Sequence, residues 1–93
     1  MMKIKENYVI QKIEDDYLVI PLAEESDRLH GILKLNETGA YLWNILINGI
    51  NNTDELVPFL IKEYKVDRSR AHEDVEAFIC KISAFGCLEG LTE

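Results

Sequence analysis

The most constraining feature of the sequence is a strand that becomes a helix with no loop between them, in residues 31–46, GILKLNETGAYLWNIL. The first five residues of this stretch predict a strand, because their apolar side chains alternate. Leu33 and Leu35 face one side of that strand. Ile32 and Lys34 face the other side. The helices behind this strand are expected to hold its edge in place.

The helix that follows has clear signals at both ends. Asn36 can cap it through its side-chain oxygen, and Glu37 in the first turn suits the positive end of the helix dipole. The Asn-Gly pair at residues 48–49 is typical of a helix C-terminus. The apolar side of the helix is predicted to consist of Ala40, Trp43, Leu46 and Ile47.

Two earlier segments predict a β-hairpin. Residues 8–13 and 17–22 are rich in β-branched and aromatic side chains, and they flank the polar turn Glu-Asp-Asp. Pro21 has no N–H to donate, so we expect it at a strand end or on an outward-facing edge. Residues 23–30 are charged and show no structural period, which predicts a loop.

Residues 51–64 predict a second helix. Asn52 with Glu55 resembles a capping box. Pro58 falls just past the first turn, where proline costs a regular helix about 3 kcal/mol, so we expect a late start or a kink. The predicted apolar stripe is Leu56, Phe59, Leu60 and Tyr64.

Residues 66–86 predict the longest helix. Asp67 or Ser69 caps its start, and Gly86 ends it. Beyond it, the last seven residues can add a short extended segment. The helix has a wide apolar arc made of Ala71, Val75, Phe78, Ile79, Ile82 and Phe85.

The order of elements predicts one α+β domain over residues 1–93, because a chain of 93 residues suits a single domain. Three antiparallel strands precede three helices, in the order β-β-β-α-α-α. The three helices with a small sheet suggest a winged helix-turn-helix shape in which the sheet comes first.

Charge and composition argue against several classes of protein. The net charge of −7 opposes a nucleic-acid partner and an anionic membrane surface, both of which need a basic face. No export signal or membrane span is visible, so we expect a cytoplasmic protein with Cys80 and Cys87 as free thiols. Two cysteines with His30 and His72 do not form a metal-ligand spacing, so we expect no metal and no cofactor.

Several motifs together resemble one known family. Residues 35–40, Leu-Asn-Glu-Thr-Gly-Ala, lead into an aromatic-rich helix, and a Tyr-x-Val-Asp element precedes Glu-Asp-Val and Phe. The latter residues are Tyr64, Val66, Asp67, Glu73, Asp74, Val75 and Phe78. Over nearly all of the chain after Tyr8, the sequence resembles the PqqD-like family, the precursor-peptide recognition elements of ribosomal peptide natural-product pathways. It departs from the family at Arg68, where proline is usual, and at Pro58.

The resemblance implies an adaptor with no catalysis of its own. Such a protein binds the leader segment of a precursor peptide and presents it to a modifying enzyme, such as a radical S-adenosylmethionine maturase or a leader peptidase. The leader is expected to lie as an added strand on the third strand, beside the third helix. The expected peptide-binding residues are Gly31, Ile32, Leu33, Lys34, Leu35, Arg70, Asp74, Phe78 and Lys81.

The residues themselves support part of this site. An edge strand leaves unpaired N–H and C=O groups that can pair with another chain. Arg70, Asp74 and Lys81 share one flank of the third helix by spacings of four and seven, with Phe78 and Phe85 at its border. This flank can line a groove with an apolar floor and a charged rim. The plainer alternatives stay open, namely an ordinary core strand and a surface ion pair.

Other functions and assemblies also stay open. The helix trio alone suggests a winged-helix DNA-binding regulator, which the acidic charge opposes. No nucleophile–base pair, phosphate loop or metal cluster supports an enzyme. His30 and His72 are expected to be solvated, and Trp43 is expected in the core. The chain is expected to be a monomer or a homodimer, because an exposed edge strand can pair with a second copy.

Overall fold

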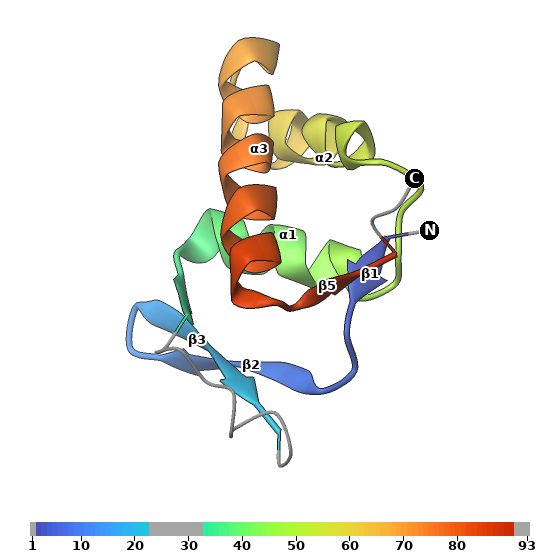
Figure 1. The fold of residues 1–93 in the computed structure, drawn as a ribbon. Coiled ribbons are helices and arrows are strands. Elements are labelled where there is room, and N and C mark those ends of the chain that lie inside the picture. The colour runs from blue at the N-terminus through green and yellow to red at the C-terminus, as the bar shows by residue number, and fades with distance from the viewer. Residues whose placement is uncertain (1, 23–32, 91–93) are drawn as a thin grey trace.

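A three-stranded antiparallel sheet followed by three α-helices forms the protein, which confirms the predicted fold class (Figure 1). The computed structural model describes residues 2–22 and 33–90. The described elements are β1 (Lys3–Ile4), β2 (Tyr8–Ile13), β3 (Asp16–Pro21), β4 (Leu33–Leu35), α1 (Glu37–Leu46), the 3₁₀ turn η2 (Thr53–Glu55), α2 (Leu56–Tyr64), α3 (Arg68–Phe85) and β5 (Leu88–Glu89).

The sheet has the order β2-β3-β4, so β2 and β4 are its two edges. In the hairpin, Ile13 pairs with Asp16, so Asp16 begins β3 instead of lying in the turn as predicted. Glu14 turns the chain with a positive φ of 57°. Pro21 lies at the end of β3, as expected. The predicted loop and the first two residues of the third predicted strand, Gly31 and Ile32, lie outside the described residues.

The direct passage from β4 to α1 is confirmed. Leu33 and Leu35 are buried while Lys34 is exposed, which is the predicted alternation. Asn36 caps α1, and its Oδ1 accepts a hydrogen bond of 2.8 Å from the Gly39 N–H. Gly39 also lets β4 approach closely, because a Cβ there would lie 3.3 Å from the Leu35 Cβ.

The predicted apolar side of α1 was wrong at one position. Ala40, Trp43 and Leu46 are buried, but Ile47 is 48% exposed. The helix ends at Leu46, so Ile47 caps it and no longer faces the core.

The second predicted helix begins late, as Pro58 suggested. The 3₁₀ turn η2 precedes α2, and the Asn52–Glu55 capping box is present at its start. The predicted stripe was wrong at Phe59, which is 44% exposed, whereas Val57 is 2% exposed. The core-facing side of α2 therefore includes the residue that follows Leu56 in the sequence.

The longest helix, α3, agrees with the prediction at both ends. The Asp67 Oδ1 accepts the Arg70 N–H at 2.8 Å, so Asp67 and not Ser69 is the cap. Gly86 ends the helix with a φ of 90°. Val75, Phe78 and Ile82 of the apolar arc are buried together with Ala71. Ile79 and Phe85 are partly buried at its margin.

Two short strands were not predicted as a pair. β1 pairs antiparallel with β5, which places the start of the chain beside the segment after α3. The Lys5 N–H also donates to the Cys87 carbonyl at 2.8 Å. The core between the sheet and the helices contains Trp43, Leu42 and Ile82, each fully buried.

Candidate functional site

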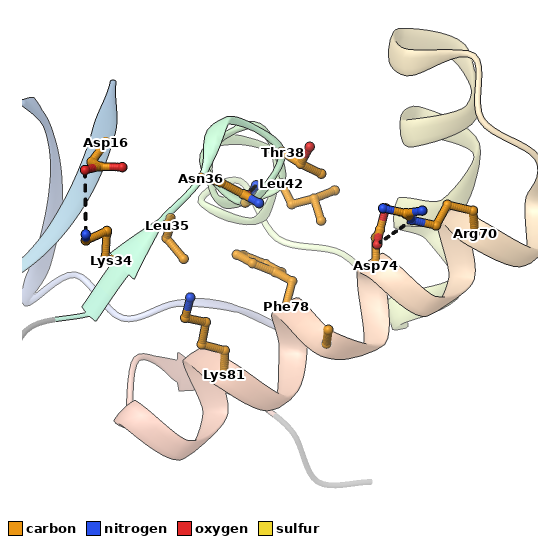
Figure 2. Close-up of a pocket in the computed structure, with 12 residues that line it drawn as sticks. Asp16, Lys34, Leu35, Asn36, Thr38, Leu42, Arg70, Asp74, Phe78 and Lys81 are labelled. Atoms are coloured by element: carbon orange, nitrogen blue, oxygen red, sulfur yellow. Dashed lines mark hydrogen bonds and ion pairs between the residues drawn. The ribbon is translucent and has the colours of Figure 1, made fainter. Parts of the chain in front are cut away.

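A groove of about 410 Å³ lies between β4 and α3, with the start of α1 at its base (Figure 2). We call it the β4–α3 groove. Side chains from β3, β4, α1 and α3 line it, together with Asn36, the cap of α1. These residues are Asp16, Lys34, Leu35, Asn36, Thr38, Gly39, Leu42, Arg70, Asp74, Ala77, Phe78 and Lys81.

The groove contains most of the residues that the sequence placed at a peptide-binding site. The lining residues among them are Lys34, Leu35, Arg70, Asp74, Phe78 and Lys81. Leu33 is not part of the lining; it is 6% exposed and packs in the core. Gly31 and Ile32 are not among the described residues. Phe85 was expected at the same border but lies outside the groove. Its ring packs edge-on against the Tyr8 ring, with 6.3 Å between the two ring centroids.

Sequence reasoning missed other lining residues, and some of them had a signal. Ala77 follows Arg70 and Asp74 by seven and three residues, so it lies on the same stripe of α3. The first turns of α1 lie beside β4, because strand and helix follow each other without a loop. The groove lining therefore also includes Thr38, Gly39 and Leu42. Asp16 had no local signal, because only the pairing of β3 with β4 brings it next to Lys34.

The floor of the groove is apolar. Figure 2 shows the Phe78 ring pointing from α3 toward Leu35 and Leu42. These three side chains are only 5%, 2% and 0% exposed, respectively. They belong to the core as well as to the groove, so the floor is held in place by packing. An apolar side chain of a bound molecule would meet a preformed surface here.

Charged side chains form the rim of the groove. Lys34 Nζ lies 3.6 Å from Asp16 Oδ2 on the sheet side. Arg70 Nε lies 3.2 Å from Asp74 Oδ1 on the helix side, which is the i,i+4 pair that the spacing predicted. Lys81 is exposed and has no ion-pair partner among residues 2–22 and 33–90.

β4, the strand beside the groove, has one edge that is open within the described part of the sheet. β4 pairs with β3 on one side, and none of the described strands pairs with its other side. Backbone N–H and C=O groups of such an edge can pair with an added strand. The groove and the edge therefore adjoin each other, with backbone groups on the strand and side-chain contacts on α3.

The two cysteines and His72 do not line this groove. Cys80 is exposed and Cys87 is buried, and both are free thiols. Burial raises the pKa of the Cys87 thiol to about 12, so this thiol stays protonated at neutral pH. His72 is exposed, as predicted, and its Nε2 lies 3.6 Å from Oε2 of Glu76. Over the described part of the chain, no group of three His, Cys, Asp or Glu residues is placed to hold a metal ion.

Comparison with known proteins decides the family. The family model of coenzyme PQQ synthesis protein D (PqqD) matches residues 8–87. The chain belongs to the PqqD family. This confirms the resemblance seen in the sequence. A comparison with curated proteins gave no match.

Two solved structures resemble this PqqD-family chain along nearly its whole length. One, titled TbiB1 in complex with the TbiA(beta) leader peptide, has a TM-score of 0.72 and 25% identity, and the match covers 98% of this chain and 99% of that one. The other is a lasso peptide synthetase B1 complexed with the leader peptide. It has a TM-score of 0.70 and 18% identity, and the match covers 96% of this chain and 98% of that one. The second likeness concerns the fold alone.

Among the helices of this family member that the structure describes, none combines the length and the apolar character needed to cross a bilayer.

Proposed function

We propose that this PqqD-family protein binds the leader segment of a ribosomally made precursor peptide and presents it to a modifying enzyme. The observation that carries the proposal is the β4–α3 groove beside the edge of β4 that none of the described strands pairs with. The TbiB1 structure, similar over almost the full length of both chains, is a complex with a leader peptide.

Strand addition is the binding mode that suits this geometry. A guest segment that pairs with β4 would gain backbone hydrogen bonds, which give affinity without depending on sequence. Alternate side chains of that segment would point toward α3 and meet the floor formed by Leu35, Leu42 and Phe78. With two or three apolar anchors, we expect a dissociation constant in the micromolar range, about −8 kcal/mol.

The role is that of an adaptor without catalysis of its own. The partner enzyme is proposed to be a radical S-adenosylmethionine maturase or a leader peptidase, both acting on a peptide held by this single domain. The proposed binding mode, strand addition, uses backbone groups and side chains and calls for no cofactor. We place the protein in the cytoplasm, where precursor peptides are made, as a monomer or a homodimer.

The alternative function, winged-helix DNA binding, gains no support from the charge. The chain carries −7 overall, and exposed positions on α3 include Glu73 and Glu76 beside Arg68 and Arg70. A helix of mixed charge on an acidic body is a poor reader of phosphates.

A pair of alanines on α3 allows a matched test of the proposed function. Ala77 lines the groove, whereas Ala84 does not, and both are exposed on the same helix. Ala77→Trp fills the groove, and Ala84→Trp places the same ring elsewhere. The probe is a phage-displayed library of random 12-residue peptides.

We expect the wild-type protein and the Ala84→Trp control to enrich the same peptides, and Ala77→Trp to enrich none of them. Circular dichroism checks that both variants fold. Failure of the wild type to enrich any peptide, or equal enrichment by Ala77→Trp, contradicts the proposed function.

A further inference from the structure

The three cations on the rim of the β4–α3 groove differ in what they contact. Lys34 is paired with Asp16, and Arg70 is paired with Asp74. Within the described residues, Lys81 alone of these three has no carboxylate within ion-pair distance. Two of the positive charges are therefore largely compensated, and the third is not.

Lys81 also lies close to the apolar floor of the groove. Figure 2 shows its side chain extending from α3 toward Leu35 on β4, beside the Phe78 ring. Lys81 follows Phe78 by three residues, so the two side chains are neighbours on one face of the helix, with Cβ atoms about 5–6 Å apart. An apolar contact and an uncompensated positive charge thus lie next to each other.

We propose that the segment bound in this groove carries an acidic side chain two residues away from an apolar anchor, and that Lys81 selects for that acid. The inference rests on the proposed function, since it describes the substrate of the same groove. In a strand, residues i and i+2 point to the same side and lie about 6.6–6.8 Å apart. That spacing matches the separation of Phe78 and Lys81, and the long lysine side chain covers the small difference.

The net charge of the protein restricts the preference for an acidic side chain to the one position near Lys81. The net charge of −7 repels a strongly acidic peptide at long range, whereas Lys81 attracts one carboxylate at short range. The preferred segment is therefore one acid beside an apolar or aromatic residue, within a peptide that is not acidic overall.

Charge reversal at Lys81 tests the inference with a matched control. Lys81→Glu inverts the charge in the groove. Lys62→Glu makes the same change at an exposed position of α2 that does not line the groove. The wild type and both variants are each used to select from the displayed library of random 12-residue peptides, and the enriched sequences are compared.

We expect the wild type and Lys62→Glu to enrich peptides with an acidic residue two positions from an apolar one. Lys81→Glu should keep the apolar preference and replace the acidic preference with a basic one. A wild-type peptide with its acid changed to lysine should bind the wild type about tenfold more weakly, and Lys81→Glu should recover part of that loss.

The outcomes separate this inference from the proposed function. Apolar enrichment without any acidic preference, or the same enriched peptides for the wild type and Lys81→Glu, overturns the inference and leaves strand addition standing. Enrichment of no peptide by the wild type contradicts the proposed function itself. Enrichment of peptides that are acidic throughout also overturns the inference. Binding would then depend on the overall acidity of the peptide and not on one acid at a fixed distance from an apolar residue.

Discussion

The two edges of the same sheet differ in almost every property that matters for binding. β2 has six residues, and Val9 and Ile13 on it are 43% and 44% exposed. β4 has three residues, and Leu33 and Leu35 on it are 6% and 2% exposed. Both strands lack a neighbour on their outer side among the described strands. Only β4 adjoins the groove against α3.

This contrast shows what makes an edge suitable for a specific guest. Length gives β2 more backbone groups to offer, but backbone pairing is largely indifferent to sequence. The short edge of β4 is held by buried leucines below and by the cap of α1 at its end. A guest on β4 meets fixed side chains on α3, whereas a guest on β2 would meet none of the groove residues.

The largest difference between the edges is expected in stability. Leu35→Ala removes a buried side chain from β4 and should lower the free energy of unfolding by about 2–5 kcal/mol. Ile13→Ala on β2 should lower it by less than about 1 kcal/mol, since Ile13 is 44% exposed. Urea denaturation followed by circular dichroism measures both. Equal losses would mean that β4 is no better anchored than β2.

The next effect is expected in binding. Phe78→Ala removes part of the groove floor and should weaken binding of a library-selected peptide by about 1–3 kcal/mol. Val9→Ala on β2 should leave the dissociation constant unchanged. Fluorescence anisotropy with the labelled peptide measures both variants.

Because Phe78 is also a core residue, the Phe78→Ala measurement needs a companion. Phe78→Leu keeps most of the buried volume and should fold, with a smaller loss of affinity than the alanine variant. If Val9→Ala weakens binding more than Phe78→Leu does, the guest lies on the wrong edge for this account.

A smaller effect is expected at the junction of β4 and α1. Asn36→Ala removes the cap that accepts the Gly39 N–H and should cost about 1 kcal/mol of stability. Asn52→Ala at η2 removes a comparable cap away from the groove. Both should lower the midpoint of urea denaturation similarly, but only Asn36→Ala should also weaken peptide binding. Identical binding by the two variants would argue against a role for this junction in fixing the edge.

The smallest effect is expected in the β2–β3 turn. Glu14 has a positive φ of 57°, which costs a residue with a Cβ about 1–2 kcal/mol. Glu14→Gly relieves this strain but adds freedom to the unfolded chain, so a net gain of about 0.5 kcal/mol is expected. Thermal denaturation measures it. Peptide affinity should stay the same, since Glu14 does not line the groove; a changed affinity would tie the hairpin turn to the site.

Local signals made much of the fold predictable. The alternation of β4, the cap at Asn36, the late start at Pro58 and the end at Gly86 all depend on near neighbours in the sequence, and the structure has each of them. The two-residue strands β1 and β5 are too short to show a period, so only the tertiary structure pairs them.

The errors on the helices have a common physical origin. A helical stripe can broaden toward either side, and the packing of the neighbouring helices decides which. In α2 the buried side extends to Val57 and leaves Phe59 exposed, and in α1 the helix ends before Ile47.

The candidate site was predictable where it follows one element and not where it depends on two. Arg70, Asp74, Phe78 and Lys81 could be grouped by helical spacing alone. Asp16 lines the groove because of the register between β3 and β4, and Leu42 lines it because of the packing of α1. Patterns of neighbouring residues in the sequence predict neither of these. That a groove lies between β4 and α3 was an implication of the family resemblance, and the structure places one there.

The central claim is that a guest peptide adds as a strand to the outer edge of β4. The most direct measurement is an isotope-edited NMR experiment on the labelled protein with an unlabelled library-selected peptide, recording contacts between the two backbones. The account predicts Hα–Hα contacts between the peptide and Leu33–Leu35, with side-chain contacts to Phe78. Backbone contacts confined to Tyr8–Ile13 on β2 would contradict it.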